Sequence, residues 1–244
     1  MKAIILSAGK GSRLGDLTAT RPKCLLPLGT KSLLGWQVEM LAQAGVSSVC
    51  VVSGFETRQV EAEVKALARP DMVMRSVFNP FYHIADNLAT CWMARSEMQD
   101  DFILLNGDTL IEAEIVRRLI ASPPAPITLT VDHKTTYDDD DMKVQLEDGR
   151  VKNVSKKLDL SIVSAESIGM IRFRADGALA FVRELEDAIR TDTGLQAFYL
   201  ASIAKLAQRL PITAASIQGL KWCEVDFPND HAAALKLTGE WAAE

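Results

Sequence analysis

The residues best suited to chemistry come directly after the first apolar run of the chain. The segment Ser7-Ala8-Gly9-Lys10-Gly11-Ser12-Arg13-Leu14 is rich in small residues, which let a backbone approach a phosphate chain and point successive N–H groups into one concavity. It has neither the third glycine of a dinucleotide-binding motif nor the lysine spacing of a P-loop. Arg21-Pro22-Lys23 follows closely, so together with Arg13 three cations are available to one folded-back loop. This pattern favours a phosphate-binding loop over a plain strand-to-helix turn.

Two carboxylates follow short apolar runs elsewhere in the chain. Asp108 comes after Phe102–Leu105, and Asp226 comes after Trp222–Val225. Open α/β sheets bind ligands at the carboxyl ends of their strands, and carboxylates from two strand ends can share one Mg²⁺ whose remaining ligands are water and phosphate oxygens. Each aspartate also has a simpler interpretation as a helix cap, Asp226 for a helix that begins at Pro228.

Composition excludes several classes of protein. The chain has 244 residues, a net charge of −5 and a pI near 5.4, which disfavours a nucleic-acid partner. No apolar run approaches the roughly 18 residues of a membrane span, and no secretory signal is expected. The cysteines have neither zinc-ligand nor disulfide spacing, which predicts buried thiols in a reducing cytoplasm; they are Cys24, Cys50, Cys91 and Cys223.

The elements that must position these residues alternate between strand-like and helix-like patterns, which predicts an α/β fold: a doubly wound, Rossmann-like, mostly parallel mixed sheet with helices on both faces. We expect one domain over residues 1–244, with a nucleotide-binding half at 1–126 and a substrate-binding half at 127–244. Asp148-Gly149 predicts a hairpin. The expected strands are Ala3–Leu6, Val49–Val52, Val73–Phe78, Phe102–Leu105, Ile127–Val131, Lys143–Leu146, Val151–Ser155, Ile168–Phe173 and Ile212–Ile217. The expected helices are Ser32–Gly45, Glu56–Ala68, Leu88–Met98, Glu112–Ala121, Asp176–Arg190, Leu195–Leu210 and a last one from Pro228.

The motifs and their order resemble the nucleotidyltransferases that make activated sugars and alcohols. The resemblance extends from residue 3 to about residue 231, and within the family it is greatest to cytidylyltransferases for phosphocholine, aminoethylphosphonate or inositol phosphate. Cys24, Thr90-Cys91 and Ala165 depart from the usual pattern. The motifs that carry it are Ala8–Arg13, Arg21–Lys23, Leu26–Leu28, Val52–Phe55, Asn87–Thr90, Asn106–Asp108, Lys143-Val144, Ser155-Lys156 and Glu224–Asp226.

The resemblance implies a reaction of EC 2.7.7 type in which a phosphate or phosphonate oxygen attacks the α-phosphorus of CTP and pyrophosphate leaves. It implies Mg²⁺ on Asp108 and Asp226, and catalytic roles for Arg13, Lys23 and Lys156. The implied nucleotide-binding residues are Leu6, Ala8, Gly9, Gly11, Ser12, Arg13, Lys23, Gly54, Asn87, Thr90 and Asp108. The candidates for binding the second substrate are Asp141, Lys143, Lys156, Glu166 and Trp222.

Other interpretations stay open at this point. Asn87 could be a turn residue, Lys143 an exposed strand residue, and the acidic run Asp138–Asp141 a solvated loop. The acceptor could be a sugar 1-phosphate or inositol phosphate, with UTP or dTTP in place of CTP. A non-catalytic nucleotide-binding subunit is a further alternative, whereas a nicotinamide-dependent oxidoreductase is disfavoured. No nucleic-acid or membrane partner is expected, and the sequence is compatible with a homodimer.

Overall fold

The computed structural model describes residues 1–243, which form two compact units built from interleaved stretches of sequence. Unit 1 contains residues 1–83, 105–116 and the chain from residue 220, and unit 2 contains residues 84–104 and 117–219. The single domain predicted over residues 1–244, with its halves at 1–126 and 127–244, stays a prediction.

Unit 1 is built around three parallel strands, β1 (Lys2–Ser7), β4 (Ser48–Ser53) and β5 (Val73–Phe78), of which β4 is central. Pairing places Ser7 opposite Ser53, so the segments after β1 and β4 leave the sheet side by side. Helices α1 (Leu33–Gln43) and α2 (Thr57–Ala66) follow these segments. Ser32 caps α1 and Gly45 adopts φ 83° just after it, as predicted from the sequence.

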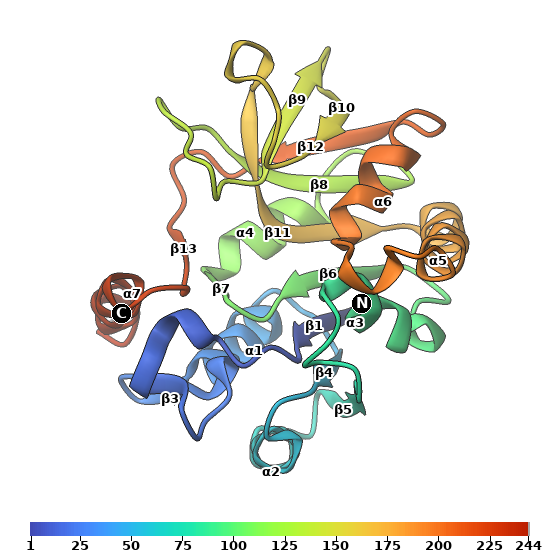
Figure 1. The fold of residues 1–244 in the computed structure, drawn as a ribbon. Helices are drawn as coiled ribbons and strands as arrows, with labels where there is room; N and C mark the ends of the chain where they lie inside the picture. The colour runs from blue at the N-terminus through green and yellow to red at the C-terminus, as the bar shows by residue number, and fades with distance from the viewer. Residues whose placement is uncertain (244) are drawn as a thin grey trace. The chain divides into compact units, whose positions relative to one another are not determined.

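The rest of unit 1 consists of two short strand pairs and the last helix, which the sequence predicted to begin at Pro228. Strands β2 (Pro27–Leu28) and β3 (Lys31–Ser32) form a small antiparallel pair, and β7 (Thr109–Ile111) pairs with β13 (Trp222–Glu224) in the same way. The last helix, α7 (Pro228–Trp241), packs against β13 and β2 (Figure 1). These short strands, α1 and α7 share a hydrophobic core that includes Leu28, Trp36, Leu110, Val225 and Ala234.

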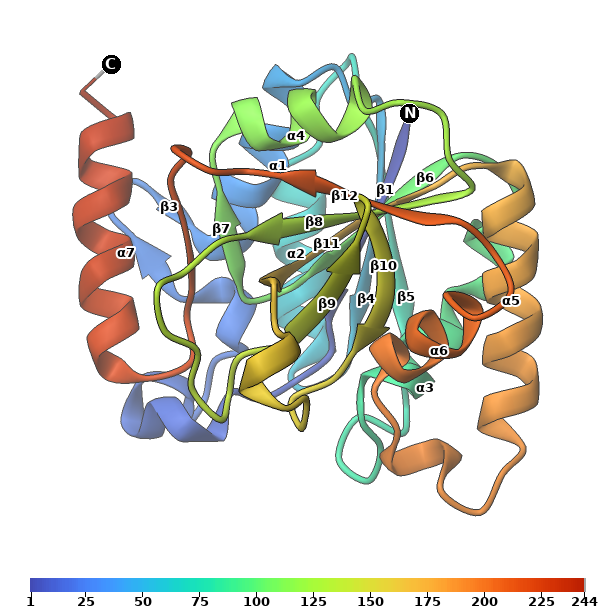
Figure 2. The ribbon, with the colours of Figure 1, turned by 90° about the horizontal axis from the view of Figure 1, so that it is seen from above.

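Unit 2 contains a mixed group of strands with three helices beside it. Strand β11 (Ala165–Phe173) is antiparallel to β8 (Ile127–Asp132) and to β9 (Lys143–Glu147), while β12 (Ile212–Ser216) runs parallel to β8. Strand β10 (Arg150–Val154) forms the predicted hairpin with β9, and Asp148 and Gly149 at its turn have φ of 51° and 72°. Helices α3 (Asn87–Met93), α5 (Ala175–Ile189) and α6 (Tyr199–Leu206) pack on one another (Figure 2). Two elements cross between the units along the chain, namely β6 (Phe102–Asn106) and α4 (Ala113–Ile120).

Two predicted helices are too long. The pattern Leu195–Leu210 contains a short 3-10 turn, Gly194–Gln196, and then α6, because Phe198 between them is extended. Similarly α3 ends at Met93, and Ala94 interrupts it before a second 3-10 turn. Apolar spacing continued across both breaks, so periodicity alone could not locate them.

Candidate active site

Asp108 and Asp226 come together because β13 pairs with β7. The register sets Glu224 opposite Thr109, and the Val225 N–H donates to the carbonyl oxygen of Asp108 at 3.0 Å. The two aspartates therefore extend from neighbouring points of one short antiparallel ladder, although 117 positions separate them. Both carboxylates keep some contact with solvent, with 26% and 19% of their side chains exposed.

The Lys23 ammonium lies between the two carboxylates. Its Nζ is 2.7 Å from Oδ2 of Asp108 and 2.7 Å from Oδ1 of Asp226, and the lysine side chain is 13% exposed. Lys23 begins the 3-10 turn Lys23–Leu25, directly after Pro22. The structure thus brings the predicted cation and both predicted metal ligands into one cluster.

Arg13 completes this cluster from the glycine-rich segment. One of its terminal nitrogens is 2.7 Å from Oδ2 of Asp226, and its guanidinium lies over the Phe227 ring, 4.9 Å from the centroid. Contact between a guanidinium and an aromatic face is favourable and orients the cation. Phe227 is absent from the residues predicted from the sequence; its position directly after Asp226 was the only available signal.

The first turn of α7 is capped by Asp230, and this separates two interpretations of Asp226. The Asp230 carboxylate accepts from the backbone N–H of Phe227 at 2.7 Å and of Asp226 at 3.0 Å. An aspartate at this third helical position satisfies the orphan donors of the helix start. The Asp226 side chain is consequently not used as a cap and faces Lys23 and Arg13 instead.

Electrostatics hold the cluster in its charged form. Burial disfavours the Lys23 ammonium, but the charges of Asp108 and Asp226 and their hydrogen bonds outweigh it and raise the lysine pKa above its ordinary value. For Asp108, burial is likewise opposed by the Lys23 charge and hydrogen bond, with a smaller contribution from Arg13, and the net effect lowers its pKa. Both shifts favour the ionised forms of Lys23 and Asp108 at neutral pH.

The glycines of this region are required by close packing. Gly11 adopts φ 77°, and a Cβ there would lie 2.8 Å from the Cβ of Lys23. At Gly54 a Cβ would lie 2.5 Å from the Ala8 carbonyl oxygen, whose partner is the Phe55 N–H at 3.0 Å. By contrast, Gly9 is exposed with open space around it, which leaves its backbone accessible to a ligand.

The other predicted nucleotide-binding residues differ in accessibility. In unit 1, Leu6 is partly buried and Ala8 is buried at the end of β1, while Ser12 is exposed. In unit 2, Thr90 is buried within α3, and the side-chain oxygen of Asn87 accepts from the Tyr199 N–H at 2.9 Å. The structure therefore gives Asn87 a local role in joining α3 to α6, and its role toward a nucleotide stays a prediction.

Lys143 and Lys156, both in unit 2, have different surroundings. Lys143 is 2% exposed and donates to the carbonyl oxygens of Asp138 and Lys156, so the alternative of an exposed strand residue is wrong. The Lys156 ammonium contacts Asp140 at 3.1 Å and its side chain is 37% exposed. Lys143 therefore holds the acidic loop in place, and Lys156 is the more accessible cation.

Asp141 and Glu166 form a second carboxylate pair, and Lys134 bridges them. The Lys134 Nζ is 2.9 Å from Asp141 and 2.7 Å from Oε2 of Glu166. Glu166 is 3% exposed, and its Oε1 is buried without a hydrogen-bond partner. Lys134 is absent from the residues predicted from the sequence, although it lies seven residues before Asp141. Trp222, the remaining residue predicted to bind substrate, belongs to unit 1, where it pairs with Ile111 in the β7–β13 ladder.

Glu166 gives a testable pH dependence. Burial, opposed by Lys134, raises its pKa from 4.5 to about 7. Because the folded protein then holds a proton more tightly than the unfolded chain, this contribution to stability is complete below pH 4.5 and is lost as the pH rises toward 7. The shift corresponds to at most about 3 kcal/mol. Glu166→Gln should remove this loss, so its unfolding free energy should fall less than that of the wild type between pH 5 and 8. Urea unfolding at both pH values checks this, and parallel curves would contradict it.

The described residues contain no cluster of three or more metal-ligating side chains, so any metal here would rely on two carboxylates and on the ligand.

All four cysteines are free thiols. Burial raises the pKa of Cys24 and Cys223 to about 12, which leaves little thiolate at neutral pH. Every helix within residues 1–243 is too short or too polar to cross a bilayer.

Comparison with known proteins identifies the family of this chain. Residues 3–199 match the MobA-like NTP transferase domain. The chain belongs to this family. Its members are nucleotidyltransferases, so the predicted enzyme class and the resemblance are confirmed. CMP-5'-(3-aminopropyl)phosphonate synthase of Streptomyces rubellomurinus is 34% identical over 125 residues, which is 51% of this chain and 20% of that protein. CTP:phosphoglutamine cytidylyltransferase of Campylobacter jejuni is 25% identical over 94% of this chain and 97% of its own length.

A solved structure confirms the fold class. The inositol-1-phosphate CTP transferase from T. maritima superimposes with a TM-score of 0.82 at 18% identity, covering 98% of this chain and 95% of that one. The predicted α/β, Rossmann-like fold with helices on both sides of its sheet is therefore correct. The relatives differ in length, and this chain spans about a fifth of the Streptomyces synthase.

Proposed function

We propose that this chain is a cytidylyltransferase that couples CTP to a small phosphorylated or phosphonate alcohol, of the phosphocholine or aminoethylphosphonate type, and releases pyrophosphate. The observation that carries the proposal is the cluster of Lys23 and Arg13 on Asp108 and Asp226, in which Arg13 comes from the same glycine-rich segment as the exposed Gly9. Phosphoryl transfer requires positioning and charge neutralisation more than covalent help from the protein, and these residues can supply both.

The carboxylate pair fits Mg²⁺. In the structure Asp108 and Asp226 already hold one cation between them, the Lys23 ammonium. Mg²⁺ is usually bound through one or two carboxylates plus substrate phosphates rather than by a full protein cage, which agrees with the absence of a third ligating side chain among residues 1–243. When bound, the metal would polarise the α-phosphate and stabilise the charge of the leaving pyrophosphate.

The two cations have distinct roles in this proposal. An ammonium has three N–H donors, and the two carboxylates accept from two of them, so Lys23 keeps one for a phosphate oxygen. Arg13 is 48% exposed and carries five donors in a planar fork that suits phosphate. Both would stabilise the charge that develops on the triphosphate as the α-phosphorus is attacked.

The attacking group does not need a base from the protein. The second pKa of a phosphate monoester is about 6, so its oxygen is largely ionised at neutral pH. The three histidines, His83, His133 and His231, are accordingly given no role in the reaction. The residues predicted to bind the acceptor, Asp141, Lys143, Lys156 and Glu166 of unit 2 and Trp222 of unit 1, stay predictions, as do the homodimer and a cytoplasmic location.

A pyrophosphate-release assay tests the proposal. CTP, UTP, dTTP and ATP are each combined with phosphocholine, aminoethylphosphonate, inositol phosphate and hexose 1-phosphates, with Mg²⁺ or with EDTA. The proposal expects turnover with CTP and a phosphocholine or phosphonate acceptor, abolished by EDTA. Turnover only with hexose 1-phosphates and UTP or dTTP, or with inositol phosphate, would replace the proposed acceptor, and silence across the grid would favour a non-catalytic nucleotide-binding protein.

A further inference from the structure

Unit 2 contains a pocket that the proposed reaction does not use. It is about 320 Å³ in volume and lies between β10, the segment after α6 and the start of β12, with residues 150–152 and 207–212 as its lining. Three of the nine lining residues are cationic, namely Arg150, Lys152 and Arg209, and none is acidic. In a chain with a net charge of −5, such a concentration of positive charge is a local feature.

Neighbouring carboxylates neutralise the three cations only in part. Arg150 is exposed and forms no ion pair with any residue of the described chain. Lys152 has one carboxylate neighbour, Glu147, at 3.4 Å, and both side chains are largely exposed. Surface pairs of this kind contribute little free energy, so Lys152 remains available to a ligand.

Arg209 forms an ion pair with a buried carboxylate. Glu184 of α5 is 6% exposed; its Oε2 lies 3.5 Å from Arg209 and its Oε1 lies 3.1 Å from Lys205. One carboxylate thus serves two cations, and Arg209 remains 67% exposed. Nearby, Gln208 donates to the Lys152 carbonyl oxygen at 2.8 Å, which ties the segment after α6 to β10 and occupies a backbone acceptor that would otherwise repel an anion.

Charge and volume together define the ligand. Guanidinium groups pair with phosphate through two parallel N–H bonds, and three cations match a ligand with more than one negative charge. A volume near the lower end for small-molecule pockets suits a compact molecule rather than a whole nucleotide. We propose that this pocket binds a small phosphate-bearing anion of the diphosphate class, independently of Arg13 and Lys23.

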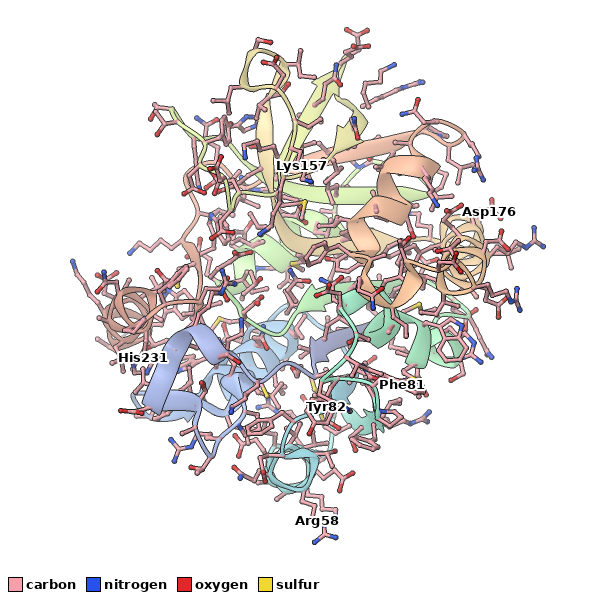
Figure 3. The ribbon with its side chains drawn as sticks, in the orientation of Figure 1. Arg58, Phe81, Tyr82, Lys157, Asp176 and His231 are labelled. Atoms are coloured by element: carbon pink, nitrogen blue, oxygen red, sulfur yellow. The ribbon has the colours of Figure 1, made fainter. Side chains whose placement is uncertain are left out.

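Calorimetric titration with inorganic pyrophosphate, without divalent metal, tests the proposal. Arg13→Gln combined with Lys23→Met first removes the phosphate-binding cations of unit 1. The double variant should still bind one pyrophosphate per chain. Adding Arg150→Gln and Arg209→Gln should weaken that binding by about 10²-fold, since each charged hydrogen-bonding group contributes about a factor of ten. Arg58→Gln is the matched control, because Arg58 extends from α2 away from its unit (Figure 3) and is exposed.

Three results would contradict the proposal. No binding in the first variant would place all pyrophosphate affinity on Arg13 and Lys23, and an equal effect of Arg58→Gln would show diffuse charge attraction. Retained binding after both arginine substitutions would exclude this pocket. The variant with all four substitutions could lose its circular dichroism spectrum. In that case Arg150→Gln is added alone to the Arg13→Gln, Lys23→Met protein, and it should weaken pyrophosphate binding about tenfold. Arg150 suits this test because it is exposed and forms no ion pair with any residue of the described chain. Arg150→Gln with Arg209→Gln in the otherwise native chain should leave turnover of CTP unchanged, so this test and that of the proposed function fail independently.

Discussion

Asp108→Asn should lower kcat by about 10³-fold, while the protein stays folded. The substitution removes a negative charge that would bind a divalent cation but keeps an oxygen that can accept from Lys23, which also retains Asp226 at 2.7 Å. The loss therefore belongs to the chemistry and not to the fold. Initial rates of pyrophosphate release over a range of Mg²⁺ concentrations measure it, and higher Mg²⁺ should restore part of the activity if weakened metal binding is the cause.

The control for this prediction is Asp176→Asn. Asp176 is an exposed residue in the first turn of α5 (Figure 3), and its amide variant should keep wild-type kinetics. A second readout is independent of turnover: Mn²⁺ binding, followed by electron paramagnetic resonance, should be weaker in Asp108→Asn and unchanged in Asp176→Asn. Wild-type kcat and Mn²⁺ affinity in Asp108→Asn would remove this residue from the reaction.

The long elements were predictable because their patterns are local. Val73–Phe78 and the hairpin at Asp148-Gly149 were located at their observed positions, and Ser32 and Gly45 marked the limits of α1. In each case a few consecutive residues contain the whole signal. The three-residue strands β7 and β13 are too short to show any alternation, and their pairing depends on a contact between segments that are more than 100 residues apart in the chain.

The same distinction applies to the site. The sequence indicated that Lys23, Asp108 and Asp226 are unusual, since each stands next to a strand end or a proline, and the structure brings them together. What it could not show was that Lys23 lies between the carboxylates, or that Lys134 makes a similar bridge in unit 2. These arrangements depend on side-chain placement in three dimensions, on which the identity and spacing of residues carry no information.

Lys23→Met should have a second large effect, on both activity and stability. Removing a preorganised cation of this kind costs about 10²–10³-fold in kcat. It also leaves Asp108 and Asp226 facing each other with only Arg13 to compensate, and breaking such a pair typically costs a few kcal/mol, about 2–4 here because the groups are partly exposed. A surface substitution, Lys157→Met, is the control, since Lys157 is exposed (Figure 3).

The pH dependence of this stability loss distinguishes charge repulsion from lost packing. In the wild type the pKa of Asp108 is lowered by Lys23 against the effect of burial, so its contribution is present above the unfolded pKa of about 3.9 and is lost as the pH falls below that value. Without Lys23 one carboxyl of the pair must take up a proton more readily, and its pKa rises above the unfolded value. The variant then loses stability as the pH rises, so the difference in unfolding free energy from the wild type should be larger at pH 7 than at pH 4.5. Urea unfolding at the two pH values measures it, and an equal difference at both would show that the ammonium does not hold the carboxylates in their charged form.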